Sequence, residues 1–353
     1  MIDTMDRNTG GRALLIAASM IVVIAGVKAA KTLILPFLIA IFLAMVTLPL
    51  LNWMRSKNLP TPFAVLATLV VALGIVVGLA VMIGGSVANI NDEIPKYRER
   101  LEEISDDALA KVEELGFPVS TDVFGDLIQP DKAWEFAQSG LRGIATALSN
   151  LFLVLLTIVF VLFEAAGIPA KLQKAFGHRR NSERFEKIKS EIQKYLAAKT
   201  VISLTTGILV GTGLAIIGVD FAFLWASLAF VLNYIPNLGS IIAAVPAVVL
   251  AMIQFGPVQA ITVAILFIAV NVVLGNVVEP YLVGRKVGLS TLVVFLSLVF
   301  WGWVWGPVGM LLSVPLTMII KIMLENTEDL RWVAILLGPA PVEEKRPKKK
   351  AVV

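Results

Sequence analysis

The sequence has no cysteine and only a single histidine. Disulfides, thiolate nucleophiles and cysteine-ligated metals are therefore excluded, and histidine-based catalysis has almost no side chain to use. Charge is also scarce: 16% of the 353 residues are Asp, Glu, Lys or Arg, whereas a typical soluble domain has about 25%. The chain contains no P-loop, dinucleotide-binding glycine motif, zinc-protease motif or nucleophile elbow. We therefore expect no enzymatic activity, no cofactor, no metal site and no ATP-driven pumping by this chain.

Apolar side chains are abundant, making up 58% of the residues. The core of a soluble protein cannot bury this many apolar side chains, because its surface has to stay polar. We therefore expect the remaining apolar side chains to face lipid. A membrane-spanning helix needs about 20 apolar residues. We predict about six full spans: Ala13–Ala30, Leu33–Leu51, Phe63–Val87, Ile144–Phe163, Val201–Gly218 and Val258–Val278. Lys28 and Lys31 directly follow the uninterrupted apolar run Ala13–Val27 of the first span, which favours an uncleaved helix over a signal peptide.

Two charged stretches of opposite sign indicate how the chain is oriented. Residues 89–141 hold thirteen acidic and five basic side chains, and their first half has the apolar spacing of an amphipathic helix. Residues 165–199 hold nine basic and three acidic side chains, with a pattern typical of an interfacial helix. The positive-inside rule places the basic stretch and both termini in the cytoplasm and the acidic stretch in the periplasm. The acidic stretch is either a cap that screens solutes or binds a partner, or a helical linker packed on its own bundle.

Four apolar segments in the second half are too short to span: Ala222–Asn233, Ile241–Ile253, Leu289–Trp301 and Val308–Ile320. The first holds 12 residues, about 18 Å of helix against a hydrocarbon core of about 30 Å. The segments meet in pairs at Asn233–Ser240 and at Gly302–Pro307. Such broken backbone cannot face lipid. We predict two oppositely oriented helical hairpins, which are typical of an inverted-repeat transporter core. Four full spans would satisfy the charge pattern equally well.

The predicted fold class is thus an all-α polytopic membrane protein with about six full spans, two hairpins and a helical periplasmic insertion. We divide the chain into 1–88 (the first three transmembrane helices), 89–143 (acidic periplasmic amphipathic helices), 144–164 (a transmembrane helix), 165–199 (a basic cytoplasmic loop and interfacial helix), 200–323 (a transport core with both hairpins) and 324–353 (a cytoplasmic tail). Because the basic residues flank apolar spans and do not alternate with exposed aromatics, we expect lipid and not nucleic acid as a partner.

Polar residues at membrane depth are costly and usually line a cavity or a solute path. The substrate-binding candidates are Asn233, Pro236, Asn237, Gly239, Ser240, Asn271, Asn276, Glu279, Ser290, Gly306 and Pro307. Several of them have a structural alternative: serine hydroxyls bond their own helix, Asn233 and Asn237 at the first tip cap helices, and Glu279 caps a helix at the interface. As a buried carboxylate, Glu279 would instead bind a proton or cation. Trp301, Trp303 and Trp305 are expected to form an interfacial belt.

At these motifs the sequence resembles the autoinducer-2 exporter (AI-2E) family, and within it the type that transports the quorum-sensing signal. The resemblance is carried by the tip Asn233–Ser240, the turn Gly275–Gly284, the start Leu289–Leu292, and Phe300–Gly309 followed by Pro315. It extends from Pro36 in the second span to Pro315, and the lysine-rich tail departs from it.

The resemblance implies an exporter of autoinducer-2, a small polar furanone-derived diol, in the bacterial inner membrane. It also implies an elevator-like movement of the two hairpins and assembly as a homopentamer. Other family members resemble sodium/proton antiporters. Three functions therefore stay open: export of a neutral diol, sodium/proton antiport through Glu279, and a non-transporting membrane scaffold.

Overall fold

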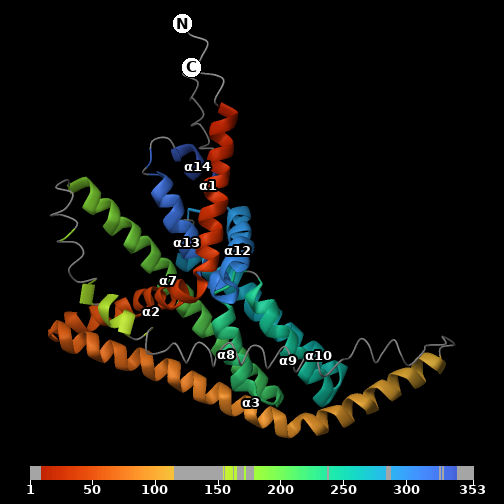
Figure 1. Cartoon of the computed structure of the whole chain (residues 1–353). Helices are drawn as coiled ribbons and strands as arrows, with labels where there is room; N and C mark the ends of the chain where they lie inside the picture. The colour runs from red at the N-terminus through yellow and green to blue at the C-terminus, as the bar shows by residue number, and fades with distance from the viewer. Residues whose placement is uncertain are drawn as a thin grey trace, which may run out of the picture. The chain divides into compact units, whose positions relative to one another are not determined.

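The computed structural model describes residues 9–114, 154, 156–161, 163–164, 171, 179–236, 238–283, 288–325, 327 and 330–339. All regular structure in these residues is helical, as the all-α prediction requires (Figure 1). Most of the predicted fourth span, the acidic region beyond Glu114 and the lysine-rich tail lie outside the described residues. The chain divides into two compact units, Met1–Gly284 and Arg285–Val353. Each unit is described below by itself.

Four helices in the described part of the chain are long and apolar enough to cross a membrane: Lys31–Ser56, Ser190–Ile217, Pro257–Leu282 and Pro307–Glu325. The first three correspond to predicted spans. The fourth was predicted to be a short arm ending at Ile320, and that prediction is wrong in length. The helix continues for another turn, where Lys321 and Glu325 form an ion pair of 2.9 Å between side chains four residues apart.

The first unit begins with α1 (Thr9–Ala29), α2 (Lys31–Ser56) and α3 (Thr61–Glu114). Small side chains let α2 and α3 pack closely, since Ala40, Ala44 and Ala64 are fully buried in one cluster. The predicted third span and the amphipathic helix are not separate elements but one 54-residue helix. Figure 1 shows that α3 bends along its length, and a proline such as its internal Pro95 is the usual cause of a kink.

The rest of the first unit comprises α7 (Arg179–Ile217), α8 (Ala222–Leu232), α9 (Gly239–Phe255), α10 (Pro257–Asn271), the π-helix η2 (Val272–Val278) and α11 (Glu279–Val283). The predicted interfacial helix and the following span are continuous in α7. An alanine stripe on α9, at Ala243, Ala247 and Ala251, is fully buried in the core that α7, α8, α9 and α10 share. Large apolar side chains such as Ile216 and Ile268 point outward, as expected for a surface that meets lipid.

The second unit contains α12 (Thr291–Trp305), α13 (Pro307–Glu325) and α14 (Arg331–Leu336). The helices α12 and α13 pack against each other and α14 packs on α13. The broken tip predicted at Gly302–Pro307 is wrong in extent, because α12 stays helical through Trp305. The only break is Gly306, whose φ of 68° and ψ of −147° favour glycine. A glycine such as Gly302 inside a helix weakens it without ending it.

The tryptophans of α12 do not all form an interfacial belt. Trp301 and Trp305 are buried, and their rings stack with centroids 4.8 Å apart. The Trp301 indole N–H donates to the Thr317 hydroxyl on α13, at 3.1 Å. Only Trp303 of the three has the exposure that a belt needs, at 59%. The other two instead help to hold α12 and α13 together.

Candidate functional site

The helices α8 and α9 form the first predicted hairpin, and Asn233–Pro236 and Leu238 between them are not helical. The two helices contact each other along the hairpin. At its base, the Asp220 amide N–H donates to the Gln254 side-chain oxygen, at 3.1 Å. The predicted break is confirmed at this tip. The α8 helix has 11 residues, about 16 Å of rise, which is well short of a full span.

Asn233 connects the tip to α7. Its amide NH₂ donates to the Ser203 hydroxyl at 3.0 Å, and its amide oxygen accepts from the Ser240 hydroxyl at 3.4 Å. Asn233 is 9% exposed and Ser203 is completely buried. Capping was the structural alternative for this residue, but its side chain reaches across to another helix. One polar side chain therefore joins α7 to the start of α9 inside an otherwise apolar bundle.

Tyr234 makes a second contact between the tip and α7. Its hydroxyl donates to the Thr200 hydroxyl at 2.8 Å, and Thr200 in turn donates to a carbonyl of its own helix. The Tyr234 ring meets Phe42 of α2 and Phe230 of α8 edge to face, with centroids 5.5 and 5.9 Å away. Edge-to-face pairs of this kind are favourable and orient the rings. The tip is thus held by both hydrogen bonds and aromatic packing.

Lys199 lies one turn before Ser203 on α7. Its ammonium donates hydrogen bonds to both carboxylate oxygens of Glu279, with N–O distances of 3.1 and 2.9 Å. Lys199 is 4% exposed and Glu279 29%. Glu279 is therefore neither a solvated cap nor a carboxylate without a counter-charge. Glu279 follows directly after η2. π-Helical segments are rare in proteins, and those that occur often lie at functional sites.

We call these polar side chains, which lie between α7, the hairpin tip and α11, the polar seam: Lys199, Thr200, Ser203, Asn233, Tyr234, Ser240 and Glu279. Four of them were not among the candidates. Lys199 was assigned to the basic cytoplasmic loop, although it lies among Ala197, Ala198 and apolar residues of the span. Its four-residue spacing from Ser203 was the signal that could have identified a polar face of α7.

The structure does not bring the other candidates into the seam. Asn271 donates to the Phe267 carbonyl of its own helix at 2.8 Å, and Asn276 is exposed on η2. Pro236 is half-buried in the turn, Gly239 is buried where α9 begins, and Asn237 lies outside the described residues. In the second unit Ser290 caps α12 by accepting from the Val293 N–H, and Gly306 and Pro307 form the turn into α13.

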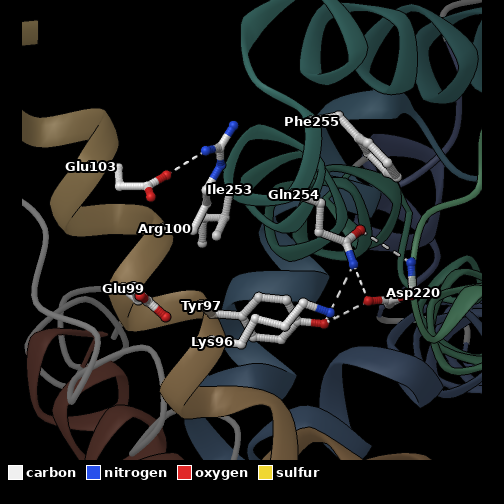
Figure 2. A pocket seen from close by; sticks show the side chains of 9 residues that line it. All are labelled: Lys96, Tyr97, Glu99, Arg100, Glu103, Asp220, Ile253, Gln254 and Phe255. Carbon is white, nitrogen blue, oxygen red and sulfur yellow. Dashed lines mark hydrogen bonds and ion pairs between the residues drawn. The ribbon is translucent and has the colours of Figure 1, made fainter. Parts of the chain in front are cut away.

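A second polar cluster lies at the base of the hairpin and lines a cavity of about 530 Å³. Figure 2 shows the side chains that line this cavity. The Tyr97 hydroxyl of α3 donates to the Asp220 carboxylate at 2.8 Å, and the Gln254 amide donates to the same oxygen. The Arg100 side chain at the rim of this cavity forms an ion pair with Glu103. Tyr97 lies in the stretch whose spacing predicted an amphipathic helix, and its partner is 123 residues away.

Burial, together with the hydrogen bond to Asp220 and the charge of that carboxylate, raises the pKa of Tyr97 above its ordinary value. The phenol therefore remains a hydrogen-bond donor at every physiological pH. Asp220 in turn accepts from two neutral donors and also binds Gln254 through its backbone. This arrangement fastens the base of the α8–α9 hairpin to α3, so the hairpin is held at both ends.

Long apolar helices, a helical hairpin broken at its tip and a polar seam buried against that tip together define a polytopic membrane transport protein. The chain belongs to the AI-2E family of transporters, whose family model matches residues 17–329. The resemblance noted from the sequence motifs is thereby confirmed.

The chain is similar along nearly its whole length to named relatives. It is 36% identical over 330 residues to the "AI-2 transport protein TqsA" of Escherichia coli (strain K12), which covers 93% of this chain and 96% of the relative. It is 38% identical over 347 residues to "Putative transport protein YhhT" of the same strain, covering 96% and 97%. A "Putative transport protein" of Haemophilus influenzae is 36% identical over 334 residues, covering 93% and 96%.

Proposed function

We propose that this chain exports autoinducer-2, a small polar furanone-derived signal, across the bacterial inner membrane. The polar seam at the tip of the α8–α9 hairpin is the observation that carries the proposal. Its amide and hydroxyl groups at Asn233, Ser203 and Ser240 match the hydrogen-bonding groups of a neutral diol, which needs no fixed counter-charge. The 36% identity to a relative named for AI-2 transport supports this choice of solute.

The proposed mechanism is alternating access by an elevator-like movement of the two hairpins. Two side chains, Asn233 and Tyr234, make the polar contacts of the first tip with α7. A diol can replace these contacts with its own hydroxyl groups, so the tip can part from α7 with little net loss of hydrogen bonding. We propose that the α12–α13 hairpin closes the path from the opposite side. From the family resemblance we also propose assembly as a homopentamer.

Sodium/proton antiport through Glu279 is the less favoured function, because the Lys199 ammonium already occupies both oxygens of that carboxylate. A scaffold function has no specific observation in its favour.

Replacing Asn233 with alanine tests the site. The change removes the amide group that bonds Ser203 and Ser240 and that would bond a solute hydroxyl. One such bond to the solute is worth about 0.5–1.5 kcal/mol net. We expect solute binding to weaken between a few-fold and about tenfold, measured as the half-saturating concentration of autoinducer-2 in proteoliposome flux. The matched control is Asn271→Ala, whose side chain bonds only its own helix, and it should transport like wild type. Unchanged flux in the Asn233 variant would exclude the tip as the binding site.

The proposed orientation places both termini in the cytoplasm and the acidic end of α3 in the periplasm. Because the chain has no cysteine, single cysteines introduced at Asp107 and Lys187 can be labelled selectively with a membrane-impermeant maleimide. In intact spheroplasts the reagent should modify the cysteine at 107 and leave the one at 187 unreacted until the membrane is opened. Reaction of both from the outside would contradict the orientation.

A further inference from the structure

The Lys199–Glu279 ion pair is unusual because its lysine is buried. A lysine that is 4% exposed has lost nearly all its water, and such a charge is stable only when it is paired and hydrogen-bonded. Both carboxylate oxygens of Glu279 lie within hydrogen-bond distance of the ammonium. Among the described residues, no other Lys or Arg forms an ion pair with Glu279. The charge of each partner is therefore balanced by the other.

Among the described residues, the ionisable side chains that lie next to the pair are phenols. The same face of α7 carries the buried phenol of Tyr195, and the Tyr234 phenol bonds to the residue after Lys199. The sequences of α8, α10 and η2 contain no titratable side chain, and α2 has only Lys31 and Arg55 near its two ends. On α11 the other titratable group is Tyr281, which is 87% exposed.

We propose that Lys199 is a built-in counter-cation, which fills the place at Glu279 that a coupling sodium ion or proton would otherwise take. The inference rests on the proposed function and extends it to energy coupling. A carboxylate among apolar helices binds a cation because the alternative is an unpaired buried charge. Here the ammonium supplies that cation permanently. Lys199 is then a specificity-determining residue, which makes transport of a neutral solute independent of sodium.

The location of the pair connects it to the solute site. Lys199 lies one helical turn from Ser203 on the same face of α7, and Ser203 accepts the hydrogen bond from Asn233. Because the pair is neutral as a whole, it leaves the adjacent amide and hydroxyl groups without a net charge to balance. A neutral diol suits such a seam, whereas a solute with a net charge would need a counter-charge of its own.

The test measures the unfolding temperature of the full-length protein in detergent, in sodium chloride and in choline chloride of equal ionic strength. Wild type should unfold at the same temperature in both salts. Lys199→Met leaves Glu279 alone, so it should unfold at least about 5 °C lower. Sodium ions, or protons supplied by a lower pH, should then restore part of that loss by binding the lone carboxylate.

Two further variants separate this role from a simple structural one. Lys199→Arg keeps a cation beside Glu279 and should remain indifferent to sodium. The double variant Lys199→Met/Glu279→Gln has no charge left to balance, so the response to sodium and to pH should disappear again. A sodium-dependent wild type, or a Lys199→Met variant that ignores both sodium and pH, overturns the proposal. If Lys199→Met does not accumulate, the wild-type and Lys199→Arg comparisons still decide.

Flux measurements separate failure of this inference from failure of the proposed function. Wild-type efflux of autoinducer-2 from proteoliposomes should be equal in sodium and choline media. An absence of efflux in either medium argues against the exporter while the unfolding measurements still test the counter-cation. Efflux that occurs only with a sodium gradient supports the exporter and overturns the role of Lys199.

Discussion

Gly239→Ala is expected to abolish most of the transport activity. Gly239 is the first residue of α9, directly after the tip, and a Cβ atom there would lie 1.8 Å from the Leu232 carbonyl oxygen and 2.6 Å from its carbon. Both are backbone atoms of the last residue of α8 and cannot rotate away. The two arms would have to separate, which moves Asn233 and Ser240 apart. Gly239 was a substrate-binding candidate, and its position argues for a packing role.

We expect Gly239→Ala to lower the free energy of unfolding by at least about 3 kcal/mol, which is the upper end of the usual cost of adding atoms to a packed core. Flux should fall by more than about tenfold, since about 1.4 kcal/mol corresponds to a factor of ten. Unfolding temperature and proteoliposome flux at matched protein amounts measure the two effects. Gly74→Ala on α3 is the control, because a Cβ there meets no atom within 4 Å. Wild-type values for the Gly239 variant would show that the tip is not tightly closed.

Gly309→Ala should have a comparable effect in the second unit. Gly309 of α13 packs against α12, and a Cβ there would lie 2.0 Å from the Trp301 carbonyl oxygen and 3.1 Å from the Trp305 Cβ. Relief requires the two helices to move apart, which breaks the hydrogen bond between Trp301 and Thr317. We expect destabilisation of about 3 kcal/mol by the same overpacking argument, with loss of flux if this hairpin closes one side of the path.

The matched control in the same hairpin is Gly302→Ala. A Cβ at this position lies 2.9 Å from its nearest neighbour, but that neighbour belongs to the flexible Met310 side chain, which can adopt another rotamer. Two of the seven tryptophans, Trp301 and Trp305, are buried in this hairpin, so its unfolding contributes to the change in tryptophan fluorescence. If Gly302→Ala destabilises the protein as much as Gly309→Ala, backbone contact is not the cause.

The all-helical membrane class and the position of the first tip could be read from the sequence because both depend on local features. Runs of apolar residues determine which segments can enter lipid, and the Asn233–Ser240 stretch interrupts the helix wherever it lies. The same reasoning wrongly predicted a break along Gly302–Pro307. There, three residues that are compatible with a helix lie between Gly302 and the Gly306-Pro307 pair. Local composition cannot tell whether a helix continues across such a stretch, because packing of Trp301 and Trp305 against α13 decides it.

The composition and order of the amino acids by themselves determined that this protein is a helical membrane protein with a broken hairpin near Asn233, and the resemblance of its motifs indicated the AI-2E family. Only the tertiary structure decided which polar groups meet. Lys199 and Glu279 are 80 residues apart, and Tyr97 and Asp220 are 123 apart. A lysine beside a basic loop has the sequence pattern of a solvated residue, and only the helices packed around it remove its water. Burial and pairing depend on neighbours distant in the chain, so no local pattern can specify them.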